Sequence, residues 1–266
     1  MTDLRHTLIV VEGAHDSAFL GRLLRRRGFT EITSKGSLPQ LWQGMIPKDF
    51  PADGDRLNHV VAYPDVFARS GDLAVGIVVA GSDGQLVPQL QRLIEISSPV
   101  SFTGIAVILD ADEVGASKKF AGVRRKIAAI NEEYRANGRA DAAIDLPDQP
   151  GVLTNGTPRV GIYVLPDNNA QGRLETLLRA CAEQAFPHLL TPTDHWVDSV
   201  RKLAAVPPAL ATPSGPDKAV LHGIGTLLQP GGSLAVAIRD HPWLPDQLPP
   251  SVDVLDKFLA DLIETP

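Results

Sequence analysis

The chain has 266 residues, of which 44% are hydrophobic and 21% charged, a balance that excludes a disordered or collagen-like protein. Its 25 Lys and Arg against 31 Asp and Glu give a formal charge of −6, which argues against attachment to DNA or a membrane by bulk positive charge. The single cysteine, Cys181, excludes an internal disulfide and a cysteine-rich zinc site. No apolar segment approaches the roughly 20 residues that span a bilayer, so we expect a cytoplasmic protein without a membrane anchor.

Four short apolar runs are each followed by a polar turn and a helical pattern, which predicts α/β construction. The expected strands are 7–11, 75–80, 104–109 and 160–165, and the expected helices are 15–27, 85–96, 118–135 and 174–185. Two of the runs, 75–80 and 104–109, are almost continuously apolar, which is typical of parallel strands covered on both faces. The sequence therefore predicts a Rossmann-like, mostly parallel sheet flanked by helices.

The pattern is weaker between residues 34 and 72, where four prolines occur. We expect an irregular insert there, with a strand near 58–62. Prolines also divide the chain after residue 187 into short pieces. The predicted organisation is a catalytic core at 1–190 and a small helical C-terminal lobe at 191–266 packed on that core.

Acidic residues follow the predicted strands, at the edge where parallel α/β sheets bind ligands. They are Glu12, Asp16, Asp110, Asp112, Asp167 and Glu175. Residues two apart on an extended strand point the same way, so Asp110 and Asp112 would repel each other unless a cation or a proton lay between them. Oxygen ligands suit Mg²⁺ or Mn²⁺, and we expect one or two such ions. Two ions can activate a water and stabilise the leaving oxygen in phosphodiester cleavage.

Each acid alone also has a purely structural interpretation. Asp16 fits a helix cap, and Asp110 and Asp112 fit turn and cap positions. Asp167 begins an Asp-Asn-Asn turn, and Glu175 is an ordinary first-turn acid. Their joint occurrence at strand ends of one predicted sheet favours the metal site.

Segments 10–16 (VVEGAHD) and 108–112 (ILDAD) resemble the glutamate and DxD motifs of Toprim domains, which occur in topoisomerases, primases, recombination proteins and OLD-type nucleases. Together with 172–175 (GRLE), their order is most similar to OLD-type nucleases and to a related set of uncharacterised bacterial and archaeal Toprim-like proteins. The resemblance covers most of the chain outside 34–72. It implies a Toprim fold and a Mg²⁺- or Mn²⁺-dependent nuclease in phage defence or DNA repair, with a separate ATPase as partner.

The resemblance also implies roles for the matching residues. Glu12 would be a metal ligand or a general acid/base. Lys218 matches the position of a late lysine in OLD-type nucleases and would steady charge on the scissile phosphate. The catalytic set is Glu12, Asp110, Asp112 and Lys218. The metal ligands are Glu12, Asp16, Asp110, Asp112 and Glu175, to which we add Asp167 from its position. Asp16 stands where some OLD-type enzymes have glutamate, so the reach of this ligand differs.

Basic residues cluster on the helices that follow the acidic strand ends, although the net charge is negative. Backbone contacts to nucleic acid need such local basic faces, with a solvated helix surface as the alternative. The candidates are Lys118, Lys119, Arg124, Arg125, Lys126, Arg25 and Arg26. Aromatic residues make up only 5% of the chain, and no strip suited to base stacking is evident.

The predicted substrate is nucleic acid, with DNA ahead of RNA. Two other functions fit the same acidic edge. One is a regulatory module that binds metal and nucleic acid or a nucleotide without cutting. The other is a small-molecule phosphatase or phosphotransferase, because acidic α/β edges with Mg²⁺ also handle phosphoryl groups. No sequence pattern indicates an oligomeric state.

Overall fold

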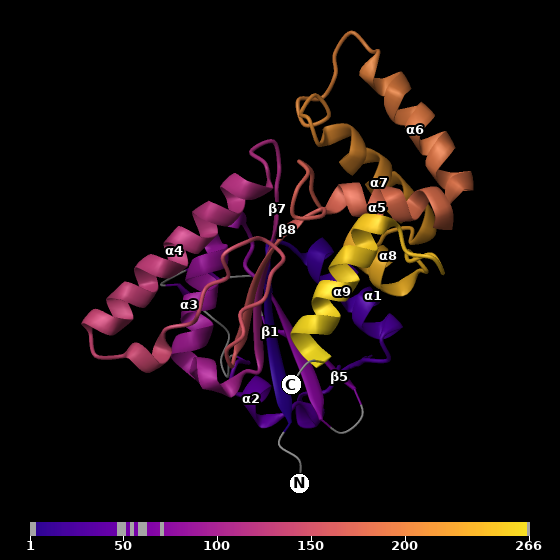
Figure 1. Ribbon diagram of the computed structural model, residues 1–266. Coiled ribbons are helices and arrows are strands. Elements are labelled where there is room, and N and C mark those ends of the chain that lie inside the picture. The colour runs from indigo at the N-terminus through magenta and orange to yellow at the C-terminus, as the bar shows by residue number, and fades with distance from the viewer. Residues whose placement is uncertain (1–3, 47–51, 54–55, 58–62, 70–71, 265–266) are drawn as a thin grey trace.

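A computed structural model of the protein describes residues 4–46, 52–53, 56–57, 63–69 and 72–264 (Figure 1). Its main sheet has the strand order β2-β5-β6-β1-β7-β8. The strands are β1 (Arg5–Val11), β2 (Thr30–Glu31), β5 (Asp65–Arg69), β6 (Leu73–Val79), β7 (Gly104–Asp110) and β8 (Arg159–Leu165). A separate pair consists of β3 (Ala52–Asp53) and β4 (Arg56–Leu57). Strands β6, β1, β7 and β8 are parallel, which confirms the predicted α/β class with a mostly parallel sheet.

The helices lie on both faces of this sheet (Figure 1). They are α1 (Ala14–Arg26), α2 (Gln40–Gln43), α3 (Leu86–Ser97), α4 (Ala116–Ala136), α5 (Leu174–Ala185), α6 (Pro187–Arg201), α7 (Gly215–Leu228), α8 (Leu234–Asp240) and α9 (Pro250–Glu264). Helices α1, α3, α4 and α5 occur where the sequence pattern predicts them. None of these described helices is both long enough and apolar enough to cross a membrane.

Side chains along each strand point alternately to the two faces of the sheet, so the interior contains two hydrophobic cores. In β1, Ile9 and Val11 face the core formed with α1 and the helices from α5 onward. Leu8 and Val10 face the opposite core, formed with α3 and α4. Because successive strand side chains point to opposite faces, a strand covered on both sides must be apolar throughout. This explains the unbroken apolar runs in the sequence.

Strand β5 lies inside the segment 34–72 that the sequence pattern indicated to be irregular. It pairs antiparallel with β6, with Phe67 opposite Val75. Trp42 of α2 is fully buried against Gly76, where an added Cβ would lie 2.3 Å from the indole ring. Much of this segment therefore belongs to the sheet and its core. The strand expected near 58–62 lies outside the described residues.

The chain from α6 to α9 is helical in its regular structure, and it shares one hydrophobic core with the sheet. The predicted boundary between residues 190 and 191 lies inside α6, which continues through Pro192. Helix α9 packs on β7 and β8, where two glycines make room for it. A Cβ on Gly161 would lie 2.7 Å from the Phe258 ring, and one on Gly104 would lie 2.8 Å from the carbonyl oxygen of Leu262.

Candidate functional site

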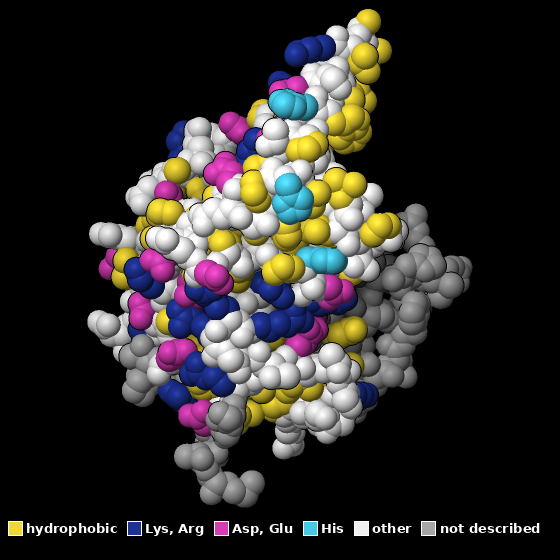
Figure 2. Space-filling model, turned by 90° about the vertical axis from the view of Figure 1, so that its right-hand side faces the viewer, with side chains coloured by type: hydrophobic (Ala, Val, Ile, Leu, Met, Phe, Trp, Pro, Cys, Tyr) yellow, Lys and Arg dark blue, Asp and Glu magenta, His cyan; other side chains and the backbone are white. Residues whose placement is uncertain are grey.

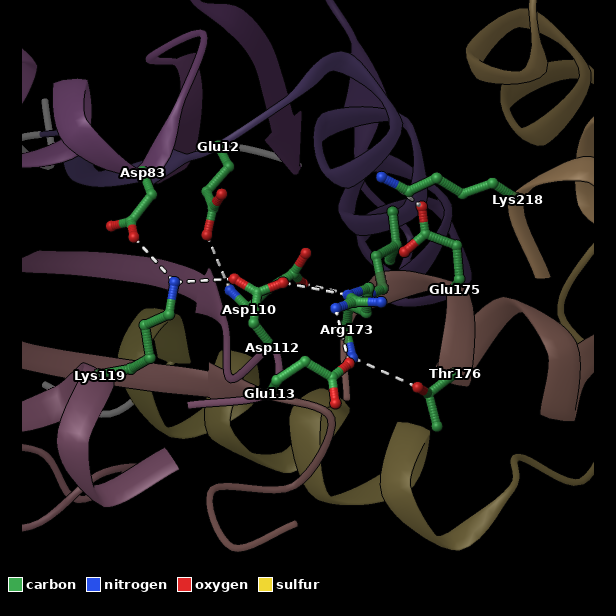
Figure 3. A network of polar contacts seen from close by, with 11 residues as sticks. Glu12, Asp83, Asp110, Asp112, Glu113, Lys119, Arg173, Glu175, Thr176 and Lys218 are labelled. Carbon is green, nitrogen blue, oxygen red and sulfur yellow. Dashed lines mark hydrogen bonds and ion pairs between the residues drawn. The ribbon is translucent and has the colours of Figure 1, made fainter. Parts of the chain in front are cut away.

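The carboxyl ends of β6, β1 and β7 meet at one edge of the sheet. Val11, the last residue of β1, is opposite Val79 in β6 and Ile108 in β7. The next residue, Glu12, accepts a hydrogen bond through Oε1 from the backbone N–H of Asp110 at 2.9 Å (Figure 3). Parallel pairing therefore brings together two acids from strands that are far apart in the sequence.

Asp16 joins this edge from the first turn of α1. Its Oδ2 accepts a hydrogen bond from the backbone N–H of Gly13 at 2.8 Å. A Cβ on residue 13 would lie 3.3 Å from the same oxygen, so the glycine leaves room for the carboxylate. The helix-cap interpretation of Asp16 is therefore correct, and the same side chain also feels the charges of Glu12 and Glu175.

Asp110 connects the end of β7 to the start of α5. Its Oδ1 accepts a hydrogen bond at 2.9 Å from the backbone N–H of Leu174, the first residue of α5. A carboxylate is favoured at this position because the N-terminus of a helix carries partial positive charge. The next residue, Glu175, is half-buried, and Lys218 of α7 places Nζ 3.8 Å from its Oε1 (Figure 3).

Glu12, Asp16, Asp110 and Glu175 form what we call the carboxylate cluster. Burial, followed by repulsion from the other acids, raises the pKa of Asp110 to about 8 and that of Asp16 to about 7. Burial also raises the pKa of Glu12, against the opposing effect of the hydrogen bond from Asp110. Ionised acids in this arrangement repel one another, so the cluster either keeps protons or needs cations to offset its charge.

A second group of charges lies beside the carboxylate cluster, and we call it the ion-paired cluster. Lys119 Nζ lies 2.8 Å from both Asp83 Oδ2 and Asp112 Oδ2. Arg173 donates from Nε to Asp112 Oδ1 at 3.0 Å and pairs with Glu113 at 3.1 Å (Figure 3). Burial alone would raise the pKa of Asp112, but hydrogen bonds from Lys119 and Arg173 lower it below its ordinary value. The charges of this cluster therefore largely balance.

The side chains of Asp110 and Asp112 point in different directions, although their spacing on an extended strand predicts the same direction. Strand β7 ends at Asp110, and Asp112 has φ 49°, in the left-handed region. The Asp112 N–H donates to the carbonyl oxygen of Gly172 at 2.8 Å, which fixes this conformation. Asp112 consequently turns to Lys119 and Arg173, and its role as a metal ligand stays a prediction.

Asp167 is involved in a local turn. Its Oδ1 accepts hydrogen bonds from the backbone N–H groups of Asn169 at 3.0 Å and Ala170 at 2.8 Å. This is the structural alternative that the Asp-Asn-Asn sequence suggests. The other predicted acids, in contrast, contact the sheet edge or its neighbouring helix.

The predicted basic residues have different environments. Lys119 belongs to the ion-paired cluster, and Arg124 pairs with Asp148 and the Pro147 carbonyl. Arg25 pairs with Glu31 and donates to the carbonyl oxygen of Arg239. Arg26 donates to the carbonyl oxygens of Pro245 and Asp246. Of the predicted basic residues on α4, Lys118, Arg125 and Lys126 are exposed. Figure 2 shows basic and acidic side chains mixed in a band across one side of the molecule.

Sequence reasoning missed four residues near this edge. Asp83 follows β6, the neighbour of β1, so its position at a strand end was an available signal. Arg173 and Glu113 lie beside recognised motif positions, but their ion pair depends on the turn at Asp112. The imidazole of His222 in α7 packs against that of His15, with ring centroids 5.4 Å apart. No local pattern connects these two histidines.

The carboxylate cluster fits a hard divalent cation in the chemistry of its donors, because all of them are carboxylate oxygens. Its raised pKa values also show that positive charge would stabilise the ionised forms. Within the described ranges, however, no three His, Cys, Asp or Glu side chains stand together as a formed metal site. Side-chain rotation would be needed for these acids to share one ion.

Comparison with known proteins shows a family and a fold. No curated protein matches the chain. It is similar to the crystal structure of the hypothetical protein PH0156 from Pyrococcus horikoshii OT3, with 19% identity, a TM-score of 0.52, and coverage of 97% of this chain and 95% of that chain. That likeness supports the fold alone. The family described as a protein of unknown function, DUF3226, matches residues 6–264, so the chain belongs to the DUF3226 family.

Proposed function

We propose that this protein is a Mg²⁺- or Mn²⁺-dependent phosphodiesterase that hydrolyses nucleic acid in the cytoplasm, in the manner of Toprim-type nucleases, with DNA ahead of RNA as substrate. The observation that carries the proposal is the carboxylate cluster, which gathers acids from β1, α1, β7 and α5 at one sheet edge. Burial and mutual repulsion raise the pKa values of Asp110 and Asp16. A divalent cation would relieve this repulsion.

Glu12, Asp16, Asp110 and Glu175 would hold the cation. When bound, it would supply Lewis-acid stabilisation of the charge that develops on the phosphate. The backbone N–H groups of Gly13 and Leu174 keep Asp16 and Asp110 at this edge through the hydrogen bonds described above. These contacts orient the carboxylates before any ligand arrives, which reduces the reorganisation that binding requires.

The remaining roles belong to side chains of the chain itself. Lys218 is 53% exposed and only 3.8 Å from Glu175, so its flexible ammonium group can contact a phosphate oxygen. Glu12 has a raised pKa, which makes it a stronger proton acceptor than an ordinary glutamate. Lys119 and Arg173 are already paired with acids, and we assign them to holding Asp112 in place.

The test compares cleavage of plasmid DNA, single-stranded DNA and RNA in Mg²⁺, Mn²⁺ and chelator. We expect metal-dependent cleavage by the wild-type protein and a loss of ~10³-fold in Asp110→Asn, in the range seen when one group that stabilises transition-state charge is removed. Asp167→Asn is the matched control, because it makes the same change at an acid confined to a turn. Thermal unfolding checks that both variants fold. Equal cleavage by the wild type and Asp110→Asn would reject the proposal.

One observation favours a second candidate, a regulatory module that binds metal and nucleic acid or a nucleotide without cutting. Both oxygens of Asp112 are held by Lys119 and Arg173, so one acid of the DxD motif is already neutralised. Calorimetry separates the two functions. Metal-dependent binding of nucleic acid without turnover would support the module, whereas turnover that depends on Asp110 would support the nuclease.

A further inference from the structure

A groove between α6 and α7 lies beside the carboxylate cluster and is not used by the proposed chemistry. Its volume of about 560 Å³ falls within the ~300–1,000 Å³ that small-ligand sites occupy. Its walls are mostly apolar and include Pro192, Trp196, Gly223 and Leu227, with Thr193, His222 and Thr226 as the polar side chains.

Helix α7 connects the groove to the carboxylate cluster. His222 lies one helical turn after Lys218, whose ammonium group is 3.8 Å from Glu175. The His222 ring also packs against that of His15, the residue before Asp16. A ligand that reaches both places would have an anionic group near Lys218 and an apolar, flat group between α6 and α7.

Trp196 distinguishes the groove from the rest of the protein. Its side chain is 57% exposed, whereas Trp42 and Trp243 are 0% exposed. Gly223 lies opposite it, and a Cβ there would be 3.9 Å from the indole and 2.6 Å from Thr193 Cγ2. The glycine therefore allows α6 and α7 to approach closely and adds no side chain beside the indole. Helix α6 projects from the rest of the molecule (Figure 1), and Figure 2 shows hydrophobic side chains along this projection.

We propose that this groove receives an unpaired nucleobase, stacked on Trp196, of a single strand of nucleic acid whose neighbouring phosphate lies at Lys218. The phosphate position rests on the proposed function, and the groove adds the substrate class, a single strand in preference to a duplex. A base has an apolar face for the indole and a polar edge for His222 and Thr226. Bases inside a duplex are already stacked and cannot enter such a groove.

The net charge of the protein opposes general attraction to nucleic acid, so affinity has to come from local contacts such as stacking. A chain with a net charge of −6 gains little from general attraction to a phosphate backbone. Stacking on an aromatic side chain is tolerant of sequence and does not depend on bulk charge. Recognition of an unpaired base would therefore supply binding energy that the overall electrostatics do not.

Tryptophan fluorescence can test the groove directly, because Trp196 is the one exposed tryptophan of the three in the sequence. The protein is titrated with a short single-stranded oligodeoxynucleotide, an abasic strand of equal length and the corresponding duplex, in chelator and again with Ca²⁺. We expect saturable quenching by the single strand, with weaker binding of the abasic strand and the duplex. Trp196→Ala should lose the quenching, and fluorescence anisotropy of a dye-labelled strand, which does not depend on Trp196, should show that it binds ~10-fold more weakly, as expected for the loss of one stacked base.

Two further variants make the result specific. Trp196→Phe keeps an aromatic face and should retain most of the affinity without the tryptophan signal. Leu203→Ala alters a 59% exposed side chain that does not line the groove, and it should behave as the wild type. Unchanged affinity in Trp196→Ala, equal binding of the abasic strand, or no binding of the single strand would overturn the proposal.

Light scattering tests the other possible occupant of the groove, which is a second copy of the chain. A change of oligomeric state in Trp196→Ala, with unaltered binding of nucleic acid, would identify the groove as an interface between copies and would overturn the proposal. The two proposals fail separately. Cleavage that is indifferent to Asp110→Asn rejects the nuclease, whereas single-strand binding that is indifferent to Trp196→Ala rejects only the base site.

Discussion

Two groups of acids at one sheet edge differ in how their charge is balanced. In the ion-paired cluster, Lys119 and Arg173 hold Asp112, and its pKa falls below the ordinary value. In the carboxylate cluster, burial and repulsion raise the pKa of Asp110 to about 8, and the ion pair described for this cluster joins Lys218 to Glu175 alone. The difference indicates that an external cation would bind at the carboxylate cluster, since only this group needs added positive charge.

The backbone produces this separation. Asp110 is still on β7, so it faces Glu12 and the start of α5. Asp112 lies beyond the strand with φ 49°, and its backbone is bonded to Gly172. The turn after β7 therefore places Asp110 and Asp112, two acids of one motif, in different electrostatic environments.

The largest expected effect separates the two acids by activity. Under the nuclease proposal, Asp110→Asn should reduce metal-dependent cleavage ~100-fold more than Asp112→Asn, because removal of a group that stabilises developing charge costs about 10²–10³ in rate. Both substitutions remove one charge and preserve shape. Initial rates measured at saturating Mg²⁺ give the ratio. Equal losses would mean that the two acids work as one unit and that the division into two clusters has no functional meaning.

A smaller effect is expected on stability when metal is added. Mg²⁺ or Mn²⁺ at a concentration well above its dissociation constant should stabilise the wild type by about 2 kcal/mol, which raises Tm by roughly 5 °C for a chain of this size. Calorimetry in metal and in chelator measures the shift. Asp112→Asn should retain most of it, and Asp110→Asn should lose it. A full shift in Asp110→Asn would place cation binding elsewhere.

The third expected effect is the pH dependence of stability without metal. The folded pKa values of Asp110 and Asp16, about 8 and about 7, lie above the unfolded value near 3.8, so the folded state binds more protons between these limits. Stability should therefore fall as pH rises from about 4 to about 8, because the protons that the folded state holds are lost over this range. Denaturant unfolding in chelator measures this slope. Asp110→Asn should flatten it, and a steeper slope in that variant would contradict the assignment.

The sequence was sufficient for elements with a strong periodic signal. The strands β1, β6, β7 and β8 and the helices that follow them are predicted from continuous apolar runs and helical stripes. Short β5 escaped prediction because only Val66 and Phe67 of its residues are fully buried, which leaves little pattern to detect. Helix α6 continues through Pro192, where a proline signal alone predicts a break.

Prediction of the site was limited by contacts between distant segments. The order of motifs was enough to bring Glu12, Asp110 and Glu175 to one edge, because parallel strands end together. The orientation of Asp112 could not be inferred, since it depends on the left-handed backbone conformation of Asp112 and on its backbone hydrogen bond to Gly172. The groove beside His222 likewise depends on how α6 packs against α7, which no local pattern records.

The seating of α9 on Gly104 and Gly161 has a consequence for biosynthesis. Phe258 and Leu262 cover β7 and β8, yet they are made about a hundred or more residues after those strands. Until α9 has been translated, the part of β7 and β8 beneath it lacks its cover and is exposed to chaperones and proteases. A chain truncated before residue 250 should accordingly be degraded in the cell, because it cannot complete the interior.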